Sequence, residues 1–323
     1  MSAEDFPVQT HELIEVRLVS VRYAARDTNL YEFQRPDGKL LPPTSAGAHI
    51  DLYLNETLVR QYSLVNDGDS PSTYLIGVKR DPASRGGSTY MHDQLRVGAL
   101  IKISPPRNNF PLDETVEHTV LIAGGIGITP ILCMLQRLQT LGKSWTLHYS
   151  SRSRVDAPFL DKLSNMPAVN LHFDQENPGK FLNLASIVAN APVGSHFYCC
   201  GPLPMLKAYE GATSELPREQ VHVEYFSSVH GLATDGGYTV EIASSGKAFD
   251  IPPGKTILSV LRDAGFVVPS SCEQGVCGAC ETRLISGEAD HRDVILTQSE
   301  RNANESIMIC CSGAKSPRLV LDL

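Results

Sequence analysis

The chain has 323 residues, which at roughly 150 residues per domain predicts two or three domains. Its composition, 42% hydrophobic and 20% charged, is that of a globular protein and excludes a wholly disordered chain. The 28 basic and 36 acidic residues give a formal charge of −8, which argues against a general nucleic-acid-binding protein because such proteins carry a basic surface.

Residues 1–16 include acidic side chains and no apolar stretch, so we expect no secretory signal. The longest run without charged residues, 119–136, is shorter than a membrane span and is interrupted by glycines and Pro130. We therefore expect a cytoplasmic protein, monomeric in solution, with neither a membrane nor a nucleic acid as its partner.

Residues 12–111 read as short β-strands. Alternating or β-rich runs at 12–23, 48–55, 72–80 and 99–106 are separated by Gly, Pro, Asp and Asn turns. Many strands with few helical stretches predict an antiparallel β-barrel or sandwich, which we assign to a first domain over residues 1–113.

After this region, strand-like and helical stretches alternate along the chain. Strands are expected at 118–125, 145–152, 169–175, 196–201 and 221–226, with helical stretches at 128–143, 157–166, 184–191 and 202–212 between them. Such alternation predicts an α/β domain with a parallel sheet covered on both faces, which we assign to residues 114–228.

Residues 227–237 are rich in Ser, Gly and Thr and predict a linker, which we bound at 229–237. The remaining residues are enough for one small third domain. This domain, assigned to residues 238–323, is expected to contain a hairpin at 238–251, a helix at 256–265 closed by Gly265, and a last strand at 319–323.

The eight cysteines are distributed unevenly, because five of them lie between Cys272 and Cys311. Without export, disulfides are not expected, so clustered thiols indicate a metal or redox site. The spacing Cys272-x4-Cys277-x2-Cys280, followed after 29 residues by Cys310, is the plant-type pattern for a [2Fe–2S] cluster. A zinc site is the alternative, but zinc ribbons usually pair two C-x2-C motifs and this segment has one.

Small residues around these thiols would let backbone N–H groups approach the cluster. Segments 268–296 and 314–323 resemble the plant-type ferredoxin domain of phthalate dioxygenase reductases and vanillate demethylase reductases. This resemblance implies an α+β domain with the β-grasp fold. Its spacing favours Cys310 as the fourth ligand, which leaves the adjacent Cys311 as a buried neighbour.

The run Arg-Gln-Tyr-Ser-Leu at 60–64 resembles the flavin-binding strand of the ferredoxin–NADP reductase superfamily. The resemblance implies that Arg60 reaches a flavin phosphate, that Tyr62 covers one face of the isoalloxazine, and that Ser63 bonds near its N5. By itself the run is also compatible with an ordinary amphipathic strand.

The glycines at 86–87 would let the backbone approach a ligand closely. We expect Ser88 and Thr89 to cap a helix at 90–95, whose N-terminus would bind phosphate; a capped helix without a ligand is the alternative. The turn resembles that of the phthalate dioxygenase reductase branch, which implies FMN rather than FAD, although Ser84 stands where a glycine is common. The predicted FMN residues are Arg60, Gln61, Tyr62, Ser63, Val78, Lys79, Arg85, Gly86, Gly87, Ser88, Thr89, Thr129 and Phe226.

Residues 123–130, Ala-Gly-Gly-Ile-Gly-Ile-Thr-Pro, lie between a predicted strand and a predicted helix. A glycine-rich turn there lets a pyrophosphate approach the helix N-terminus, and a proline early in a helix favours a helix start. The pattern is not the strict Gly-x-Gly-x-x-Gly fingerprint, but it resembles the version of the ferredoxin reductase superfamily. A tight turn without a ligand is the alternative.

Two further strand ends, at 149–152 and 199–202, are expected at the same edge of the sheet, where ligands bind. The superfamily resemblance places Cys200 near the nicotinamide C4, whereas Cys199 reads as a buried small residue. The predicted NADH residues are Gly124, Gly125, Gly127, Ile128, Thr129, Pro130, Ser150, Arg152, Cys200, Gly201 and Pro202.

Arg152 and Arg154 would suit the 2′-phosphate of NADPH or equally be solvated loop charges, and the resemblance implies NADH. It also implies that Phe226 stacks on the flavin, where core packing is the alternative, and that Glu224 helps to position the nicotinamide. The residues assigned to positioning for hydride transfer are Ser63, Cys200 and Glu224.

Together the three parts describe an electron relay. A nicotinamide gives up two electrons as a hydride, a [2Fe–2S] cluster accepts one at a time, and a flavin converts between them. No cysteine is followed by histidine at the spacing of a Rieske cluster, so the acceptor is expected to be a separate protein. The resemblance covers nearly the whole chain and implies the reductase component of a two-component Rieske oxygenase, either an aromatic-ring dioxygenase or a demethylase.

Two other functions stay open. The chain could be a stand-alone NAD(P)H-dependent flavin or quinone reductase in which the cluster is a side branch. It could instead be a non-enzymatic iron–sulfur carrier with vestigial nucleotide sites. The sequence does not name the oxygenase substrate, because a reductase component does not touch it.

Overall fold

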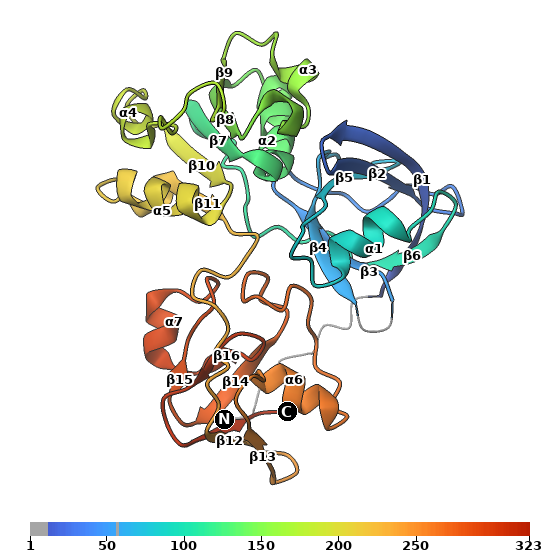
Figure 1. The fold of residues 1–323 in the computed structure, drawn as a ribbon, viewed down its shortest axis with the longest axis vertical. Coiled ribbons are helices and arrows are strands. Elements are labelled where there is room, and N and C mark those ends of the chain that lie inside the picture. The colour runs from blue at the N-terminus through green and yellow to red at the C-terminus, as the bar shows by residue number, and fades with distance from the viewer. Residues whose placement is uncertain (1–11, 56–57) are drawn as a thin grey trace. The chain divides into compact units, whose positions relative to one another are not determined.

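Figure 1 shows the computed structural model of the chain, which describes residues 12–55 and 58–323. The residues pack into two compact units. One contains the chain up to Cys199 together with Glu215–His222, and the other contains Cys200–Ser214 together with Val223–Leu323. The multidomain fold predicted from the sequence is confirmed, while the exact domain boundaries stay predictions.

The N-terminal sheet is antiparallel and has six strands. These are β1 (Ile14–Ala25), β2 (Thr28–Gln34), β3 (His49–Tyr53), β4 (Val59–Ser63), β5 (Tyr74–Lys79) and β6 (Leu100–Ile103), in the order β4-β3-β6-β1-β2-β5. A bridge between Leu64 and Ile76 joins the two ends of this order, so the sheet closes into the predicted barrel. The barrel also carries a short helix, α1 (Gly87–Asp93).

Alternation of side chains explains why these segments form a half-buried barrel wall. In β1, Val16 and Leu18 are fully buried, while Glu15 and Arg17 are exposed. Period-two alternation places one set of side chains in the core and the other in water. Each fully buried Val or Leu stabilises the fold by about 1.5–3 kcal/mol relative to an exposed one.

The second sheet has five strands and matches the predicted α/β pattern. It contains β7 (His118–Gly124), β8 (Ser144–Ser151), β9 (Val169–Phe173), β10 (His196–Cys200) and β11 (Val221–Glu224), in the order β11-β10-β7-β8-β9. The β7–β8 and β8–β9 pairs are parallel. Six consecutive residues of β7 are buried, which indicates that the strand is covered on both faces.

The helices of this region differ from the expectation in one place. The observed helices are α2 (Ile128–Thr140), α3 (Leu160–Leu163), α4 (Leu184–Ala189) and α5 (Leu203–Ala212), with single turns at Gly125–Gly127, Arg154–Asp156 and Arg218–Gln220. The helix predicted over 157–166 is reduced to the one turn of α3. Pro158 holds Ala157 in an extended conformation, and Phe159 takes a positive φ of 63°, so no helix can start earlier.

The C-terminal domain has a mixed sheet in the order β13-β12-β18-β14-β16. Its strands are β12 (Tyr238–Ile242), β13 (Lys247–Ile251), β14 (Glu281–Ser286), β16 (Ser306–Met308) and β18 (Arg318–Leu321), with a small pair of β15 (Ala289–Asp290) and β17 (Gly313–Ala314). Strand β12 pairs in parallel with β18, and α6 (Ile257–Asp263) buries Ile257, Leu258 and Leu261. A helix packed by its apolar side with a mixed sheet is the predicted β-grasp arrangement.

Local signals explain the ends of α6. The Thr256 side chain caps its first turn in a capping box with Ser259. Gly265 follows the helix with a φ of +86°, and Phe266 N–H returns to the Leu261 carbonyl at 3.0 Å. This left-handed glycine ends the helix where the sequence predicted it.

The segment predicted as a linker has no regular secondary structure, but it is held by the C-terminal domain. Ala233 N–H donates to the Cys311 carbonyl at 2.8 Å, and Gly254 N–H donates to the Thr234 carbonyl at 2.8 Å. The Arg292 guanidinium also donates to the His230 carbonyl at 3.3 Å. We call residues 228–237 the docked segment. Its polar, glycine-rich composition predicts a solvated linker. In the structure, its backbone is instead hydrogen bonded to residues of the C-terminal domain.

No helix within residues 12–55 and 58–323 is long and apolar enough to cross a membrane.

Barrel stability should fall in acid because of His49. This side chain is 1% exposed, and its burial, helped by Arg107, lowers the pKa of His49 from its ordinary 6.5 to about 4. Between pH 6.5 and pH 4, the His49 side chain is protonated in the unfolded chain but stays neutral in the folded barrel. The free energy of unfolding is therefore highest above pH 6.5. It decreases by about 3 kcal/mol as the pH falls to 4.

Urea unfolding followed at pH 7 and pH 4.5 measures this loss. Neither ring nitrogen of His49 has a hydrogen-bond partner, so His49→Leu should fold and show a smaller difference between the two pH values. The exposed His230→Gln is the matched control and should behave like the wild type. An unchanged pH dependence in His49→Leu would contradict this account.

Candidate functional site

Arg60 lies across the start of α1, as the flavin prediction requires. Its Nη2 donates to the Arg85 carbonyl at 2.7 Å. A Cβ at Gly87 would lie 2.5 Å from Arg60 Cγ, so only glycine permits this crossing. Gly86 adopts a φ of +94°, which favours glycine as well. Strand β4 and helix α1 thus bring a guanidinium beside the first helical turn, where the Thr89 N–H donates to the Ser84 hydroxyl at 3.4 Å. The predicted phosphate contact at this turn stays a prediction.

The predicted capping of α1 is wrong. The helix begins at Gly87 and its N-cap is Gly86, which provides no side chain, so Ser88 and Thr89 lie inside the first turn. The Ser88 hydroxyl instead accepts from Asp81 N–H at 3.1 Å. The left-handed conformation of Gly86 starts the helix before the two hydroxyl residues. They remain candidates for contacting a phosphate from the first turn.

The remaining residues of the barrel strands occupy different environments. Tyr62 packs against the barrel core, and burial raises the pKa of Tyr62. Ser63 ends β4, is 6% exposed, and pairs in register with His49, as Gln61 does with Asp51. The predicted contacts of these residues with a flavin stay predictions.

At the end of β5, Val78 points into the barrel core and Lys79 is exposed. The Val78 carbonyl lies 3.0 Å from His92 Nε2. The predicted contacts of Val78 and Lys79 with FMN stay predictions.

The glycine-rich turn of the second sheet packs against the barrel at Gly77. A Cβ at Gly77 would lie 2.8 Å from Thr129 Cγ2 and 3.6 Å from Ile126 Cδ1. The Thr129 hydroxyl donates to the Ile126 carbonyl at 3.0 Å, which fixes the turn in this contact. Sequence reasoning named Thr129 but missed Gly77, whose signal is a glycine inside a β-rich run.

The turn itself has the predicted strand–turn–helix form. Strand β7 ends at Gly124, a single turn spans Gly125–Gly127, and α2 begins at Ile128. Gly125 has a φ of +53°, and the Tyr149 hydroxyl donates to its carbonyl at 3.2 Å. Pro130 lies in the first turn of α2, where its missing N–H costs nothing. The N-terminus of a buried helix therefore faces this turn, as phosphate binding requires.

The other predicted strand ends also lie where the sequence placed them. Ser150 is buried in the last residues of β8, and Cys200 is the buried last residue of β10, before Gly201 and Pro202. The neighbouring Cys199 is fully buried, and burial raises the pKa of its thiol. This agrees with its interpretation as a small apolar residue.

The two arginines after β8 are not equivalent. Arg154 forms a two-point ion pair with Glu176, with distances of 2.6 and 3.1 Å, and its guanidinium lies 4.6 Å from the Phe173 ring centroid. Arg152 is exposed beside it. Arg154 is thus already engaged by a carboxylate, which weakens its candidacy for a 2′-phosphate.

Phe226 follows β11 with 42% of its surface exposed, so the alternative of core packing does not hold. The neighbouring Tyr225 hydroxyl donates to Glu210 on α5, while Glu224 is half-buried at the end of β11. An exposed aromatic ring directly after a sheet strand is available to cover a ligand.

The structure gathers the four predicted cluster thiols. The side chains of Cys277 and Cys310 lie close enough to Cys272, and that of Cys310 close enough to Cys280, to shift the pKa of these thiols. The contact with Cys310 and burial raise the pKa of Cys280. All four side chains are buried, although they come from a loop and from a segment 30 or more residues later. Four neighbouring buried thiols are the donor set that a [2Fe–2S] cluster requires, although no group of three or more His, Cys, Asp or Glu side chains among the described residues is already placed to hold a metal ion.

Backbone donors surround this group. The N–H groups of Gln274 and Val276 point at Cys272 Sγ from 3.3 and 3.4 Å. Such N–H donors stabilise a thiolate ligand. Gly275 takes a φ of +70° between them, and Gly278 takes +76°. The loop therefore fits a thiolate-bound cluster in its donors and in its backbone.

The adjacent cysteines have different surroundings. Cys310 joins the other three thiols, whereas Cys311 Sγ donates to the Met308 carbonyl at 3.6 Å. A Cβ at Gly275 would lie 2.4 Å from Cys311 Sγ, so Cys311 fills the space beneath the loop. This arrangement agrees with Cys310 as the fourth ligand and Cys311 as a buried neighbour.

Comparisons with known proteins agree with this geometry. Residues 240–315 match the family described as a 2Fe-2S iron-sulfur cluster binding domain. The chain is 50% identical to phenoxybenzoate dioxygenase subunit beta of Ectopseudomonas oleovorans over 311 residues, covering 96% of this chain and 97% of that one. It is 47% identical to tetrachlorobenzoquinone reductase of Sphingobium chlorophenolicum over 324 residues, covering 98% and 99%.

A solved structure of phthalate dioxygenase reductase is also similar. It is described as a modular structure for electron transfer from pyridine nucleotides to [2Fe-2S]. The two chains share a TM-score of 0.78 and 40% sequence identity, with 96% of this chain and 98% of that chain covered. The likeness therefore extends over all three sheets.

The space beneath the thiol loop gives a direct test. In Gly275→Ala the new methyl would lie 2.4 Å from Cys311 Sγ and 2.9 Å from Asp293 Cα, whereas in Gly278→Ala the nearest atom is 3.7 Å away. Both positions have positive φ, so both variants carry a similar backbone cost of about 1–2 kcal/mol. We expect iron and sulfide per purified chain to fall about tenfold more in Gly275→Ala. Equal losses would show that backbone conformation alone matters.

Proposed function

Because the chain belongs to the phthalate dioxygenase reductase and vanillate demethylase reductase family, the reductase components of Rieske oxygenases, we propose that it passes electrons from NADH through FMN and a [2Fe–2S] cluster to a separate oxygenase. The observation that carries the proposal is the buried group of four neighbouring thiols. The same chain has a glycine-rich turn at 123–130, which packs against barrel strand β5 at Gly77.

FMN supplies the step from a two-electron donor to a one-electron acceptor. The chain's own residues would bind and orient it. Arg60 offers a charge to the phosphate beside the first turn of α1, and Gly87 leaves room for that contact. Tyr62 would present its ring from β4, and the exposed ring of Phe226 would cover the isoalloxazine. The choice of FMN over FAD rests on the resemblance of the turn at 84–88.

NADH would bind along the ends of β7, β8 and β10. The turn before α2 would hold the pyrophosphate through its N–H groups. Cys200 and Glu224 would border the nicotinamide from the ends of β10 and β11, with Ser63 near the flavin N5. The ion pair of Arg154 with Glu176 removes one candidate for a 2′-phosphate, so we propose NADH rather than NADPH.

The proposed partner is a terminal oxygenase of aromatic catabolism, because this chain carries no Cys-x-His or Cys-x2-His pair for a Rieske cluster of its own. The eight cysteines are all buried and none is in a disulfide. Free thiols suit a reducing compartment, which supports a cytoplasmic location. We propose a monomer that docks transiently on its oxygenase.

Cys277→Ser tests the relay. Loss of one of the four thiols should remove the cluster while the flavin and nucleotide sites remain intact. We expect oxygenase-coupled turnover to fall at least about a hundredfold, whereas NADH oxidation with ferricyanide stays within about twofold of wild type. Full coupled turnover without a cluster would overturn the proposed route. A visible spectrum of the wild type that does not bleach with NADH would show a carrier without enzymatic activity.

A quinone reductase is the second candidate, since the chain is 47% identical to a tetrachlorobenzoquinone reductase. The same variant distinguishes the two functions. If a substituted benzoquinone is the natural acceptor of flavin electrons, Cys277→Ser should retain its quinone reduction. If the oxygenase is the natural acceptor, wild-type turnover with quinone should be far slower than with the oxygenase.

Arg60→Met tests the flavin cradle. A charge-assisted hydrogen bond to phosphate contributes about 1.5–3 kcal/mol, so FMN affinity should fall roughly ten- to hundredfold. The matched control is Arg80→Met, which removes an exposed ion pair with Asp93 on the same helix. Titration of flavin-free protein with FMN and with FAD measures both affinities. Equal FMN affinities in the two variants, or tighter binding of FAD than FMN by the wild type, would contradict the assignment.

A further inference from the structure

A buried carboxylate lies beside the thiol loop and has no role in the proposed electron route. Asp293 is completely buried in the turn at 290–296, which begins at the last residue of β15. Its Oδ2 accepts from Ile295 N–H at 3.0 Å and from Leu296 N–H at 2.8 Å. A buried carboxylate is costly unless charges and hydrogen bonds compensate it. Its surroundings should therefore contain a matching cation.

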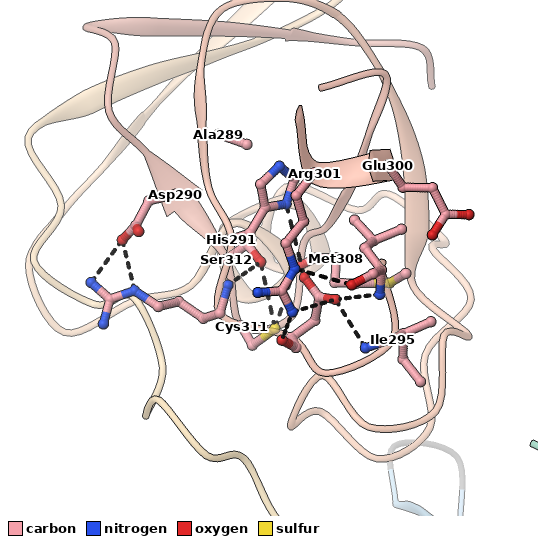
Figure 2. Close-up of polar contacts among 12 residues, drawn as sticks. Ala289, Asp290, His291, Ile295, Glu300, Arg301, Met308, Cys311 and Ser312 are labelled. Atoms are coloured by element: carbon pink, nitrogen blue, oxygen red, sulfur yellow. Dashed lines mark hydrogen bonds and ion pairs between the residues drawn. The ribbon is translucent and has the colours of Figure 1, made fainter. Parts of the chain in front are cut away.

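Arg301 on α7 (Gln298–Ala303) supplies that cation, as Figure 2 shows. Its Nη2 donates to the Asp293 carbonyl at 2.5 Å and lies 3.8 Å from the Asp293 carboxylate, while its Nε donates to the Leu296 carbonyl at 3.1 Å. Thr297 and Glu300 form a capping box at the start of α7, which fixes the helix and the arginine it carries. One guanidinium thus ties Asp293, in the middle of the turn, to Leu296 at its end.

The other side of the carboxylate faces an imidazole. His291 Nδ1 lies 3.9 Å from Asp293 Oδ1. The carboxylate is therefore enclosed between a guanidinium and a histidine side chain that is 8% exposed.

The turn at 290–296 supports the thiol loop at its centre. Val294 N–H donates to the Gly275 carbonyl at 3.0 Å. A Cβ at Gly275 would lie 2.9 Å from Asp293 Cα, so the two backbones are in direct contact. Gly275 lies midway between Cys272 and Cys277, and displacement of the turn would move both thiols.

The same turn also supports the segment that carries the fourth thiol. Arg292 N–H donates to the Ser312 hydroxyl at 3.0 Å. Cys311 lies between this contact and Gly275, directly after Cys310. Both thiol-bearing segments therefore rest on one turn, whose shape depends on the buried Asp293 carboxylate and on Arg301.

We infer that Asp293 and Arg301 are positioning residues for the iron–sulfur cluster, which fix the distance between the loop at 272–280 and Cys310. The inference rests on the proposed cluster. The pair touches none of the four thiols by a hydrogen bond of its own. It acts through the Val294–Gly275 and Arg292–Ser312 contacts, and so sets how firmly the cluster is held and at what potential it is reduced.

Asp293→Asn keeps the shape of the side chain and removes its charge. Loss of a group that positions a metal ligand typically weakens metal binding by about 10–100-fold. An iron chelator should therefore bleach the visible absorbance of this variant at least about tenfold faster than that of the wild type. The midpoint potential of the cluster and the EPR spectrum of its reduced form should shift as well. Arg301→Met should reproduce both effects, and Arg301→Lys, which keeps the charge, should partly restore them.

Two control variants separate positioning from general stability. Asp263→Asn makes the same chemical change in an exposed ion pair with Lys255 of the same domain, and it should match the wild type. Val240→Ala opens a cavity in the fully buried core and should lower the thermal midpoint of the domain without shifting the cluster potential.

The inference is overturned if Asp293→Asn retains its cluster as well as Asp263→Asn does. It is also overturned if Asp293→Asn loses iron faster only to the extent that its thermal midpoint falls, as in Val240→Ala, while the cluster potential is unchanged. If Asp293→Asn does not fold, the comparison of Arg301→Lys with Arg301→Met decides by the same readouts. A wild type without iron and sulfide would instead refute the proposed function. The two failures are therefore distinguishable.

Discussion

Four thiol groups from two separate segments must meet in one buried place, and the C-terminal domain is organised around that requirement. Gathered thiolates repel one another and lose hydration, so backbone donors, close packing and bound iron have to compensate. The N–H groups of Gln274 and Val276 face Cys272, and Gly275 packs on Cys311. The mixed sheet and α6 hold this arrangement by burying a continuous apolar core that includes Cys280 and Cys310.

Close backbone approach recurs at three of the candidate functional positions. Gly77 lets the nucleotide turn pack on the barrel, Gly87 lets Arg60 cross the start of α1, and Gly275 lets the thiol loop rest on Cys311. At each of these glycines an added Cβ would lie within 3 Å of a side-chain atom. Each of these contacts depends on a glycine, because a larger side chain would displace the neighbouring atoms.

Much of the fold followed from local patterns. Alternation predicted β1, and apolar spacing with an early proline predicted α2. Three features did not follow, because each depends on partners distant in sequence or on backbone conformation. Gly86 starts α1 before the hydroxyl residues expected to cap it. Pro158 and Phe159 shorten α3. The docked segment 228–237 reads as a linker by composition, yet it bonds to Cys311 and to Gln274 in the thiol loop.

The sequence by itself determined which chemistry the chain can hold. The types and spacing of Cys272, Cys277 and Cys280, and the glycine-rich turn at 123–130, carry that information along short stretches. Only the tertiary structure showed that Cys311 fills the space beneath Gly275, and that Asp293 and Arg301 meet beside the thiol loop. Adjacent residues point in different directions, and ion pairs between loops leave no periodic pattern. Packing, not spacing, therefore selects among them.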